Sequence, residues 1–466
     1  MRSTIALLLL AGSLSTAGAA LRAGAAAVDI TPRQWPVRLA GGFTPPWTDK
    51  VHDRLHVRTI VLDDGRTRIA IGVVDSCYVP GEVLDEAKAL AHTRTGIPTN
   101  RMLLSATHTH SAPFAQHLNP SESEKAYTRQ LIGDIAQSIE RAHAALEPAQ
   151  VAWTKVDIPD ELFNRRWFLK EGTMPVNPFG RTDDKVKMNP GRNNLVKPAG
   201  GTDPEFSIVS LRTAAGKPLA VLGNYSLHYV GGVRGAVISA DYFGEYARLV
   251  AERLAPGDAK FVGILSNGTS GDVNNNDLVG PPVRREPFEK IRIVAEKLAA
   301  ATEKALKDLP HRGDLDLAMS ERVLPLQWRK PDKEHLEWAK HALDEADQSK
   351  LPSLAKAYAE RAVRLHQGPD IASVKLQTIR IGTLGIASIP AEVFTEIGLE
   401  IKEKSPLKPS FTIELANGAF GYLPTPEQHA LGGYETWLGT NRLEIEASRK
   451  IVSALLEMFD EVKPRR

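Results

Sequence analysis

The chain has 466 residues, of which 42% are hydrophobic and 24% are charged, as in an ordinary globular protein. Its 58 Lys and Arg residues nearly balance its 56 Asp and Glu residues, which excludes the concentrated basic surface that nucleic-acid binding requires. Cys77 is the only cysteine, so the fold uses no internal disulfide, and we expect any metal site to use His and carboxylate ligands.

Residues 1–19 have the pattern of a cleaved signal peptide. Arg2 precedes the short apolar run Ile5–Leu10, and Ala17-Gly18-Ala19 fits the small-residue cleavage rule. A transmembrane anchor is the alternative, but this apolar run is short and is diluted by Ser, Thr and Gly. No later segment approaches the run of about 18 apolar residues that a membrane span needs. We therefore expect a secreted or periplasmic protein without a transmembrane segment.

Strands and helices alternate in the first part of the chain. The runs Val57–Leu62 and Arg68–Asp75 flank a turn sequence and predict a β-hairpin. Ile69–Val74 is almost continuously apolar, as in a strand that is covered on both faces. A helix, a buried strand and an amphipathic helix follow at Gly81–Thr93, Arg101–Ala106 and Ser121–Leu146. This alternation predicts a mixed α/β fold in which helices cover a β-sheet core.

Residues 160–205 are rich in Pro and Gly and predict a long irregular excursion of the kind that often carries function. Regular elements resume with strands at Phe206–Leu211, Leu219–Tyr225 and Phe261–Leu265 and helices at Asp241–Leu254 and Phe288–Leu309. Residues 331–367 predict a helical hairpin that breaks at Leu351-Pro352. The last predicted elements are strands at Val374–Ile381, Leu384–Ile389 and Phe411–Leu415 and helices at 393–404 and Leu443–Phe459.

The strongest local motif is Thr107-His108-Thr109-His110-Ser111, which directly follows the strand that ends at Ala106. Residues two apart in an extended backbone point the same way, so His108 and His110 would face one cavity at the strand end. Imidazole is a good ligand for Zn²⁺, and a neighbouring His can act as an acid or a base. The motif alone is weak, and two hydrogen-bonded loop histidines are the alternative.

Polar side chains follow other predicted strands in the same way. His228 comes after Leu219–Tyr225, and Glu392 comes after an apolar strand and before helix 393–404. Tyr422 and Tyr434 flank a loop rich in Gly and Pro. Each has a structural alternative: a hydrogen-bonded core histidine, a glutamate in the first turn of a helix, and packed aromatic rings.

A polar turn at residues 266–274 raises two further alternatives. Ser270 lacks the spacing of a nucleophilic serine, because Gly271 follows it directly, so a serine hydrolase is disfavoured. Asp272 begins a sequence that resembles a calcium loop, but Asp277 stands where such a loop needs glycine.

The ordered set of motifs is more specific than any of its members. In chain order they are Ala27-Val28-Asp29-Ile30-Thr31-Pro32, Val51-His52-Asp53-Arg54-Leu55, Thr107-His108-Thr109-His110-Ser111, Asn164-Arg165, Ile238-Ser239-Ala240-Asp241, Gly271-Asp272-Val273 and Ile389-Pro390-Ala391-Glu392. This succession resembles the neutral/alkaline (non-lysosomal) ceramidase family over residues 24–440. The resemblance implies a ceramidase-like catalytic domain over residues 20–466, with the hairpin 331–367 as an insertion. We expect the chain to have this catalytic domain but to lack the C-terminal immunoglobulin-like domain of characterised ceramidases.

The resemblance also implies the residues of the site. It implies a zinc ion held by four side chains: His108, His228, Glu392 and Tyr422. His110 would be the acid/base group, and Arg165 and Tyr434 would contact the scissile amide and its developing oxyanion. The chain departs from the family at Asn274, where the family has serine.

The expected function is that of a secreted zinc-dependent amidohydrolase that acts on linear amides. A zinc-activated water would hydrolyse an N-acyl amide, converting ceramide to sphingosine and fatty acid, or cleaving a related amide. The expected partner is a small-molecule or lipid amide, with peripheral membrane contact for access to a lipid. Two alternatives stay open: a zinc esterase, lactonase or amidase for a non-sphingolipid substrate, and a catalytically silent binding protein on the same scaffold.

Overall fold

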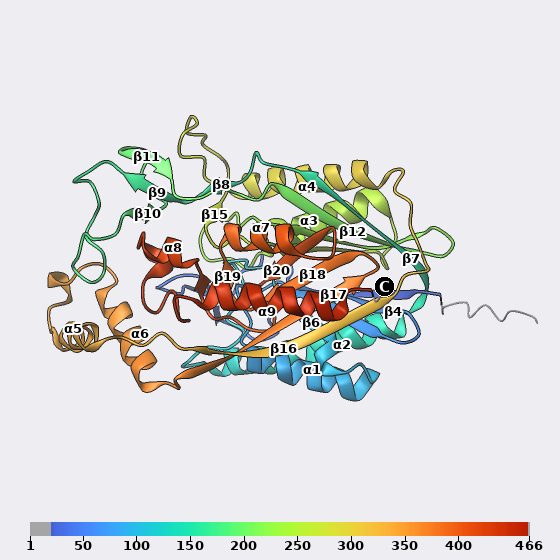
Figure 1. The fold of residues 1–466 in the computed structure, drawn as a ribbon, viewed down its shortest axis with the longest axis horizontal. Coiled ribbons are helices and arrows are strands. Elements are labelled where there is room, and N and C mark those ends of the chain that lie inside the picture. Colours follow the sequence, from blue (N-terminus) through green and yellow to red (C-terminus); the bar gives the residue numbers. More distant parts are fainter. Residues whose placement is uncertain (1–19, 465–466) are drawn as a thin grey trace, which may run out of the picture.

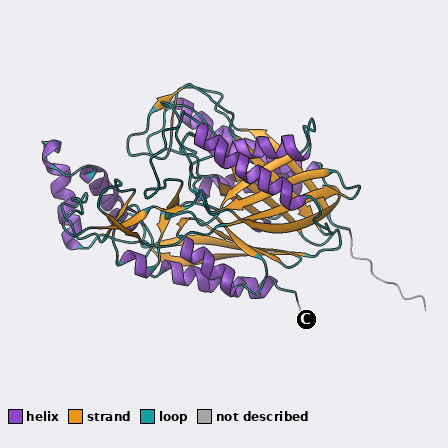
Figure 2. Ribbon diagram, turned by 90° about the horizontal axis from the view of Figure 1, so that it is seen from above, coloured by secondary structure: helices purple, strands orange, loops and turns teal. Residues whose placement is uncertain are grey.

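Two β-sheets lie at the centre of the molecule, between outer layers of helices (Figure 1, Figure 2). The computed structural model describes residues 20–464, so the predicted signal peptide 1–19 lies outside the described residues. The larger sheet contains β1 (Arg22–Asp29), β4 (His56–Asp63), β5 (Arg68–Val74), β6 (Met102–Ala106), β7 (Glu147–Asp157), β12 (Glu205–Thr213), β13 (Pro218–Tyr225) and β14 (Val262–Asn267). The smaller sheet contains β16 (Leu317–Gln327), β17 (Ile371–Ile381), β18 (Leu384–Ile389) and β20 (Ser410–Glu414).

Both sheets are mixed. The strand orders are β14-β13-β12-β7-β1-β4-β5-β6 and β16-β17-β18-β20. The pairs β5–β6, β13–β14 and β18–β20 are parallel, whereas the other neighbouring strands are antiparallel. The predicted mixed α/β class is therefore confirmed.

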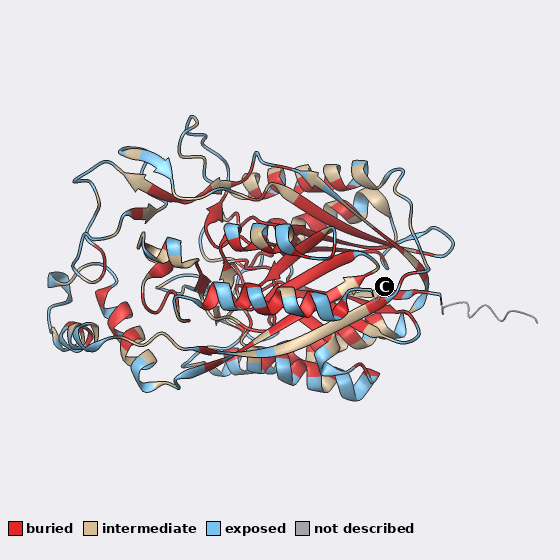
Figure 3. Cartoon of the chain, viewed as in Figure 1, coloured by how far each residue is buried: buried red, intermediate tan, exposed pale blue. Residues whose placement is uncertain are grey.

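Four packed cores join the layers. One core packs α1 (Gly81–Thr95) and α2 (Glu122–Ala144) on β1, β4, β5 and β6, and another packs α3 (Asp241–Leu254) and α4 (Glu289–Leu306) on β12, β13 and β14. A third core lies between the two sheets, and a fourth packs α7 (Thr395–Lys404) and α9 (Ala447–Val462) on the smaller sheet. The buried strands between half-exposed helices are visible in Figure 3.

Strand β5 shows why its sequence is almost wholly apolar. Ile69, Ile71 and Val73 face the core between the sheets, while Ala70 and Val74 face α1 and α2. Alternate side chains of a strand point to opposite faces, so a strand covered on both sides needs apolar residues at every position. The prediction for this segment is confirmed.

Three long strands have sequences that only weakly favour β-structure. β1 reads Arg-Ala-Gly-Ala-Ala-Ala-Val-Asp, and alanine and glycine are poor strand formers. β7 and β16 carry charged residues among apolar ones and are long, each paired with a neighbouring strand along its length. Pairing with distant strands overrides the weak local propensity in each case.

Residues 160–205 are less irregular than predicted. They contain β8 (Phe163–Asn164), β9 (Arg166–Leu169), β10 (Val186–Met188) and β11 (Leu195–Pro198). β10, β9 and β11 form a small sheet of their own, and β8 pairs with β15 (Val273–Asn274). The prediction of a long irregular excursion missed these short strands, because each has only two to four residues and gains its structure by pairing with another segment.

The helices α5 (Lys333–Asp344) and α6 (Ala355–Gln367) lie at one end of the molecule (Figure 1). They meet through four small side chains: Ala339, Ala342, Ala359 and Ala362. Alanine lets two helix backbones approach closely, and the outer face of α5 remains exposed (Figure 3). Among residues 20–464, no helix combines the length and apolar composition that a membrane crossing would require.

Candidate metal centre

Three ligand atoms converge at the ends of strands that are far apart in the sequence. His108 follows β6, His228 follows β13, and Glu392 begins the short strand β19 (Glu392–Val393) after β18. The Nε2 atoms of His108 and His228 are 3.0 Å apart, and they lie 3.4 and 3.7 Å from Oε2 of Glu392. Two imidazole nitrogens and a carboxylate oxygen are a ligand set that suits Zn²⁺.

Hydrogen bonds on the far side of each ring orient the two histidines. Nδ1 of His108 lies 2.7 Å from the Cys77 carbonyl oxygen, and Nδ1 of His228 lies 3.1 Å from the Ser270 carbonyl oxygen. A carbonyl only accepts, so Nδ1 donates in both rings and each neutral ring turns an Nε2 lone pair inward. Oε2 of Glu392 is buried there without a hydrogen-bond partner. These three inward lone pairs repel one another unless a cation lies between them, so the residues fit a metal ion.

The electrostatics of His108 agree with this fit. Burial opposes the charged ring, but the Cys77 sulfur and the Glu392 carboxylate together raise the pKa of His108 well above its usual range. Burial lowers the pKa of His228, and the positive charge of Arg165 lowers it further. The centre therefore favours one added positive charge beside Glu392, which a bound cation would supply in place of a proton.

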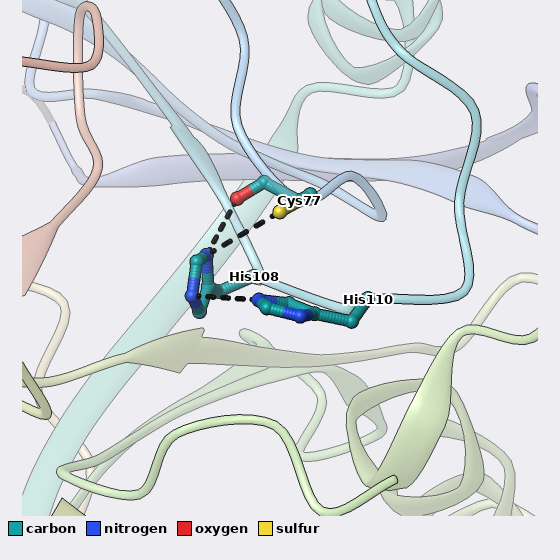
Figure 4. A group of neighbouring side chains, drawn as sticks. All are labelled: Cys77, His108 and His110. Atoms are coloured by element: carbon teal, nitrogen blue, oxygen red, sulfur yellow. Dashed lines mark hydrogen bonds between the residues drawn. The ribbon is translucent and has the colours of Figure 1, made fainter. Parts of the chain in front are cut away.

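His108 and His110 meet by a different route from the one predicted. His108 has a φ of 75°, in the left-handed region, so the backbone is not extended at this point. The turn still brings the two Nε2 atoms within 3.2 Å, with the rings at 80° to each other (Figure 4). The convergence of the two side chains is as expected, but the strand alternation that was its basis is wrong. A non-glycine residue held at positive φ is a strained conformation of the kind that gathers at functional sites.

Cys77 also lies beside the centre, although the sequence favoured only His and carboxylate ligands. Its buried Sγ is 3.9 Å from Nδ1 of His108, and Cys77, His108 and His110 form a second group of ligand type (Figure 4). Cys77 approaches His108 at Nδ1, which already bonds to the Cys77 carbonyl, whereas His110 approaches it at Nε2. We therefore favour the group formed by His108, His228 and Glu392. The strand-end rule could have found Cys77, since it follows β5 closely.

Tyr422 lies against the ligands. It begins β21 (Tyr422–Leu423), which pairs with β19 so that Tyr422 stands opposite Glu392. Its ring is nearly parallel to that of His228, with centroids 6.4 Å apart. Burial and the nearby Glu392 carboxylate raise the pKa of Tyr422 well above its usual range, against the effect of Arg165. The structure thus brings Tyr422 to the centre, and its role as fourth ligand stays a prediction.

Arg165 is held by a buried carboxylate that the sequence did not single out. Its Nε donates to Glu435 at 2.8 Å, and Nη1 of Arg166 donates to the other oxygen of Glu435 at 2.7 Å. All three side chains are buried. Nη2 of Arg165 is buried without a partner, so it can donate to a substrate. Glu435 immediately follows Tyr434, the first residue of η3 (Tyr434–Thr436), whose ring lies 5.7 Å from that of Tyr422.

His110 lies between a glycine and an aromatic ring. Its ring stacks on Tyr229 at a centroid distance of 3.7 Å and an angle of 16°. A Cβ at Gly41 would come within 2.4 Å of the His110 ring, and Gly41 has a φ of +105°. Burial lowers the pKa of His110 well below its usual range, and the charges of His108 and Arg165 add to this. His110 is therefore a neutral imidazole in a fixed position.

We expect Gly41→Ala to lower kcat by about tenfold or more, because the new methyl group would push His110 aside by roughly an ångström. Gly42→Ala is the matched control, since its Cβ meets nothing closer than Thr44 N at 4.0 Å and its φ is not positive. Steady-state kinetics and thermal unfolding of both variants provide the test. Equal kcat values for the two variants would show that Gly41 does not position His110.

A cavity of about 380 Å³ opens over the centre. Its polar wall is formed by the predicted site residues His110, Arg165, His228, Tyr422 and Tyr434. Its apolar wall is formed by Phe43, Met174, Val176, Met188, Leu354 and Trp437. Leu354 comes from the segment before α6, so the helical hairpin contributes to the cavity. Asn274 bonds to Asn189, another lining residue, and so supports the wall of the cavity from behind.

Ser270 does not face this cavity. Its side chain is buried, and its Oγ donates to Oε1 of Glu414 at 2.6 Å. Burial raises the pKa of Glu414 to about 8 despite this hydrogen bond. Ser270 supports the ring of His228 from behind, which leaves no nucleophile at this position and argues against the serine hydrolase. Asp272 is likewise engaged in the fold, because its carboxylate accepts from Thr395 and Asn164.

Comparisons with known proteins agree with these observations. Residues 21–286 match the family described as "Neutral/alkaline non-lysosomal ceramidase, N-terminal". Neutral ceramidase of Drosophila pseudoobscura pseudoobscura is 25% identical over 289 residues, which are 59% of this chain and 39% of that protein. Neutral ceramidase B of Dictyostelium discoideum is 25% identical over 287 residues, 58% of this chain and 37% of that protein. The matched part of the chain thus spans well under half the length of these curated relatives.

The fold is similar to that of a solved structure, the neutral ceramidase of Pseudomonas aeruginosa. The TM-score is 0.70 at 19% identity, and the similarity covers 96% of this chain and 76% of that chain. It therefore extends beyond residues 21–286 to the segments that carry Glu392, Tyr422 and Tyr434.

Proposed function

The chain belongs to the neutral/alkaline non-lysosomal ceramidase family, and on this basis we propose that it hydrolyses an N-acyl amide with a bound zinc ion. The observation that carries this proposal is the convergence of His108, His228 and an unpartnered Glu392 oxygen beneath the cavity. The substrate is ceramide or a related linear amide. The pattern of residues 1–19 supports action in the periplasm or outside the cell.

His108, His228, Glu392 and Tyr422 would hold the zinc ion. When bound, the ion supplies Lewis-acid activation of water and of the amide carbonyl. The backbone carbonyls of Cys77 and Ser270 keep the two imidazoles in the tautomer that can bind it.

His110 is placed to move protons. Its Nε2 lies 3.2 Å from Nε2 of the ligand His108, and its ring lines the cavity. It accepts a proton at Nε2 from the attacking water and returns it to the amide nitrogen as the carbon–nitrogen bond breaks. Because His110 is held between Gly41 and Tyr229, its ring is already positioned for proton transfer when the substrate binds.

Arg165 and Tyr434 are placed to stabilise the oxyanion. Nη2 of Arg165 has no partner in the described chain, and Tyr434 lines the same cavity. Each donor to a developing oxyanion is worth about 3 kcal/mol. Glu435 fixes the guanidinium so that this donor is already oriented before the substrate arrives.

A substrate screen tests the proposed function. The full chain is loaded with zinc and offered an N-acylsphingosine, a short-chain acyl amide and the matching esters. We expect amide hydrolysis that a chelator abolishes and added zinc restores. Cleavage of the esters alone would support the esterase or lactonase alternative. Zinc-loaded protein that cleaves none of these substrates would support the binding-protein alternative.

A further inference from the structure

Three arginines near the catalytic cavity lack a carboxylate partner. Arg361 and Arg364 lie three residues apart on α6, so both side chains lie on one face of this helix. Arg442 follows η3 in the chain. Among residues 20–464, none of the three forms an ion pair, whereas the more remote Arg253 pairs with both Glu296 and Glu303.

Arg361 is held in place by packing rather than by charge. Its guanidinium carbon lies 4.6 Å from the ring centre of Phe43 and 5.2 Å from that of Tyr358. Its stem lies on Gly439, where a Cβ would come within 2.8 Å of Cβ of Arg361. Its one polar contact is a long one of 3.5 Å to the Thr440 hydroxyl. Its remaining N–H donors therefore have no partner among residues 20–464.

Arg442 lies beside the segment that carries Tyr422. Its stem lies beside Gly421, the residue before Tyr422, and its half-buried side chain makes no hydrogen bond within the described chain. Burial lowers the pKa of Arg442, and the charges of Arg361 and Arg364 lower it further, while Tyr78 and Glu392 oppose this. Within the described chain, three like charges thus act on one another, and none of them has a carboxylate within ion-pair distance.

This region adjoins the catalytic cavity. Phe43 lines the cavity and also carries the Arg361 guanidinium on its ring, and Phe43 lies 6.4 Å from Tyr434 between ring centres. A molecule that extends from the metal centre to the Phe43 wall of the cavity therefore reaches the ring on which Arg361 packs. Two of the three come from the helical hairpin, so the hairpin supplies most of this charge.

We propose that Arg361, Arg364 and Arg442 form a subsite that binds a carboxylate or phosphate group carried by the substrate. Guanidinium groups bind these oxyanions through paired, charge-assisted hydrogen bonds, and a bound anion would relieve the repulsion among the three arginines. A lipid surface would need cations that project outward, whereas Arg361 and Arg442 are half-buried. The subsite rests on the proposed function only for its use: an N-acyl amine with an acidic group is then a substrate.

Binding of inorganic phosphate to the zinc-loaded full chain tests the subsite without catalysis. We expect calorimetry to show binding that weakens by about tenfold or more in Arg442→Gln, since a charge-assisted hydrogen bond is lost. Arg253→Gln removes the same charge elsewhere and should bind phosphate as the unmodified chain does. Arg364→Gln is a second variant, because its exposed side chain can change without disturbing the fold.

Either of two results would overturn the subsite. One is phosphate binding that is absent, or that is as strong in both Arg442→Gln and Arg364→Gln as in the unmodified chain, as it would be if phosphate bound only to the metal. The other is a failure to bind phosphate together with Arg364-dependent binding to vesicles of phosphatidylserine, which would indicate a membrane contact instead.

A comparison of substrates identifies which anionic group the subsite binds. N-acyl amines that carry a carboxylate, a phosphate or a neutral hydroxyl are compared by kcat/KM. We expect one acidic substrate to be preferred, and Arg442→Gln to lower the ratio of its kcat/KM to that of the neutral amide by about tenfold. Arg253→Gln should leave this ratio unchanged. If no amide is cleaved, the proposed function fails while phosphate binding still decides the subsite.

Discussion

His110→Ala is expected to lower kcat by roughly 10²–10⁴-fold while the protein keeps its metal. The variant loses the group that moves the proton, but the atoms that converge on the metal position belong to His108, His228 and Glu392. Steady-state kinetics on the best amide substrate, beside elemental analysis of the same sample, provide the measurement.

His117→Ala is the matched control for this prediction. It removes an imidazole from the same loop, and His117 contacts Asn119 and Phe114 rather than the cavity. It should retain the activity of the unmodified chain. A His110→Ala protein with unchanged kcat would refute the acid/base role, and one that lost its metal would make His110 a ligand.

Glu435→Gln is expected to lower the free energy of unfolding by about 3–5 kcal/mol, the usual cost of breaking a buried ion pair. Glu435 is fully buried and is the shared partner of Arg165 and Arg166, so its loss leaves two buried guanidinium groups without a counter-charge. Urea unfolding of the purified variant measures the change. Activity should fall as well, because Arg165 loses the contact that orients it.

Glu457→Gln gives the contrast for this second prediction. Its exposed pair with Arg322 should contribute under about 1 kcal/mol. Similar losses of stability for the two variants would contradict the buried role of Glu435.

Local patterns predicted the elements whose sequences are periodic or flanked by strong signals. The long helix α2 begins after Ser121, whose side chain and that of Glu124 form a capping box. The buried strands β5, β6, β13 and β18 were visible as apolar runs. Strands such as β1 were not, because their residues gain strand structure only by pairing with distant segments.

The candidate site was predictable where a polar residue follows a buried strand. This rule and the ordered motifs led to His108, His110, His228 and Glu392, which the structure brings together. The motifs also led to Arg165, which lines the same cavity and whose Nη2 has no partner in the described chain. Their roles in binding and catalysis stay predictions.

The residues that support the site were not predictable. Glu435 acts on Arg165 across 270 positions in sequence, and Gly41 matters only because the His110 ring lies against it. Arg361 and Arg442 likewise form no ion pair among the described residues, because the fold places no carboxylate within ion-pair distance of them there. No local pattern reports such contacts, since they arise only when distant segments pack together.

Metal analysis of the purified chain decides whether His108, His228 and Glu392 hold a zinc ion. His228→Ala and Cys77→Ser are measured beside the unmodified chain, since each changes only one of the two possible ligand groups. We expect about one zinc per chain in the unmodified protein and in Cys77→Ser, and loss of zinc in His228→Ala. Zinc that persists in His228→Ala but disappears in Cys77→Ser, or an unmodified chain that takes up no zinc, would contradict this assignment.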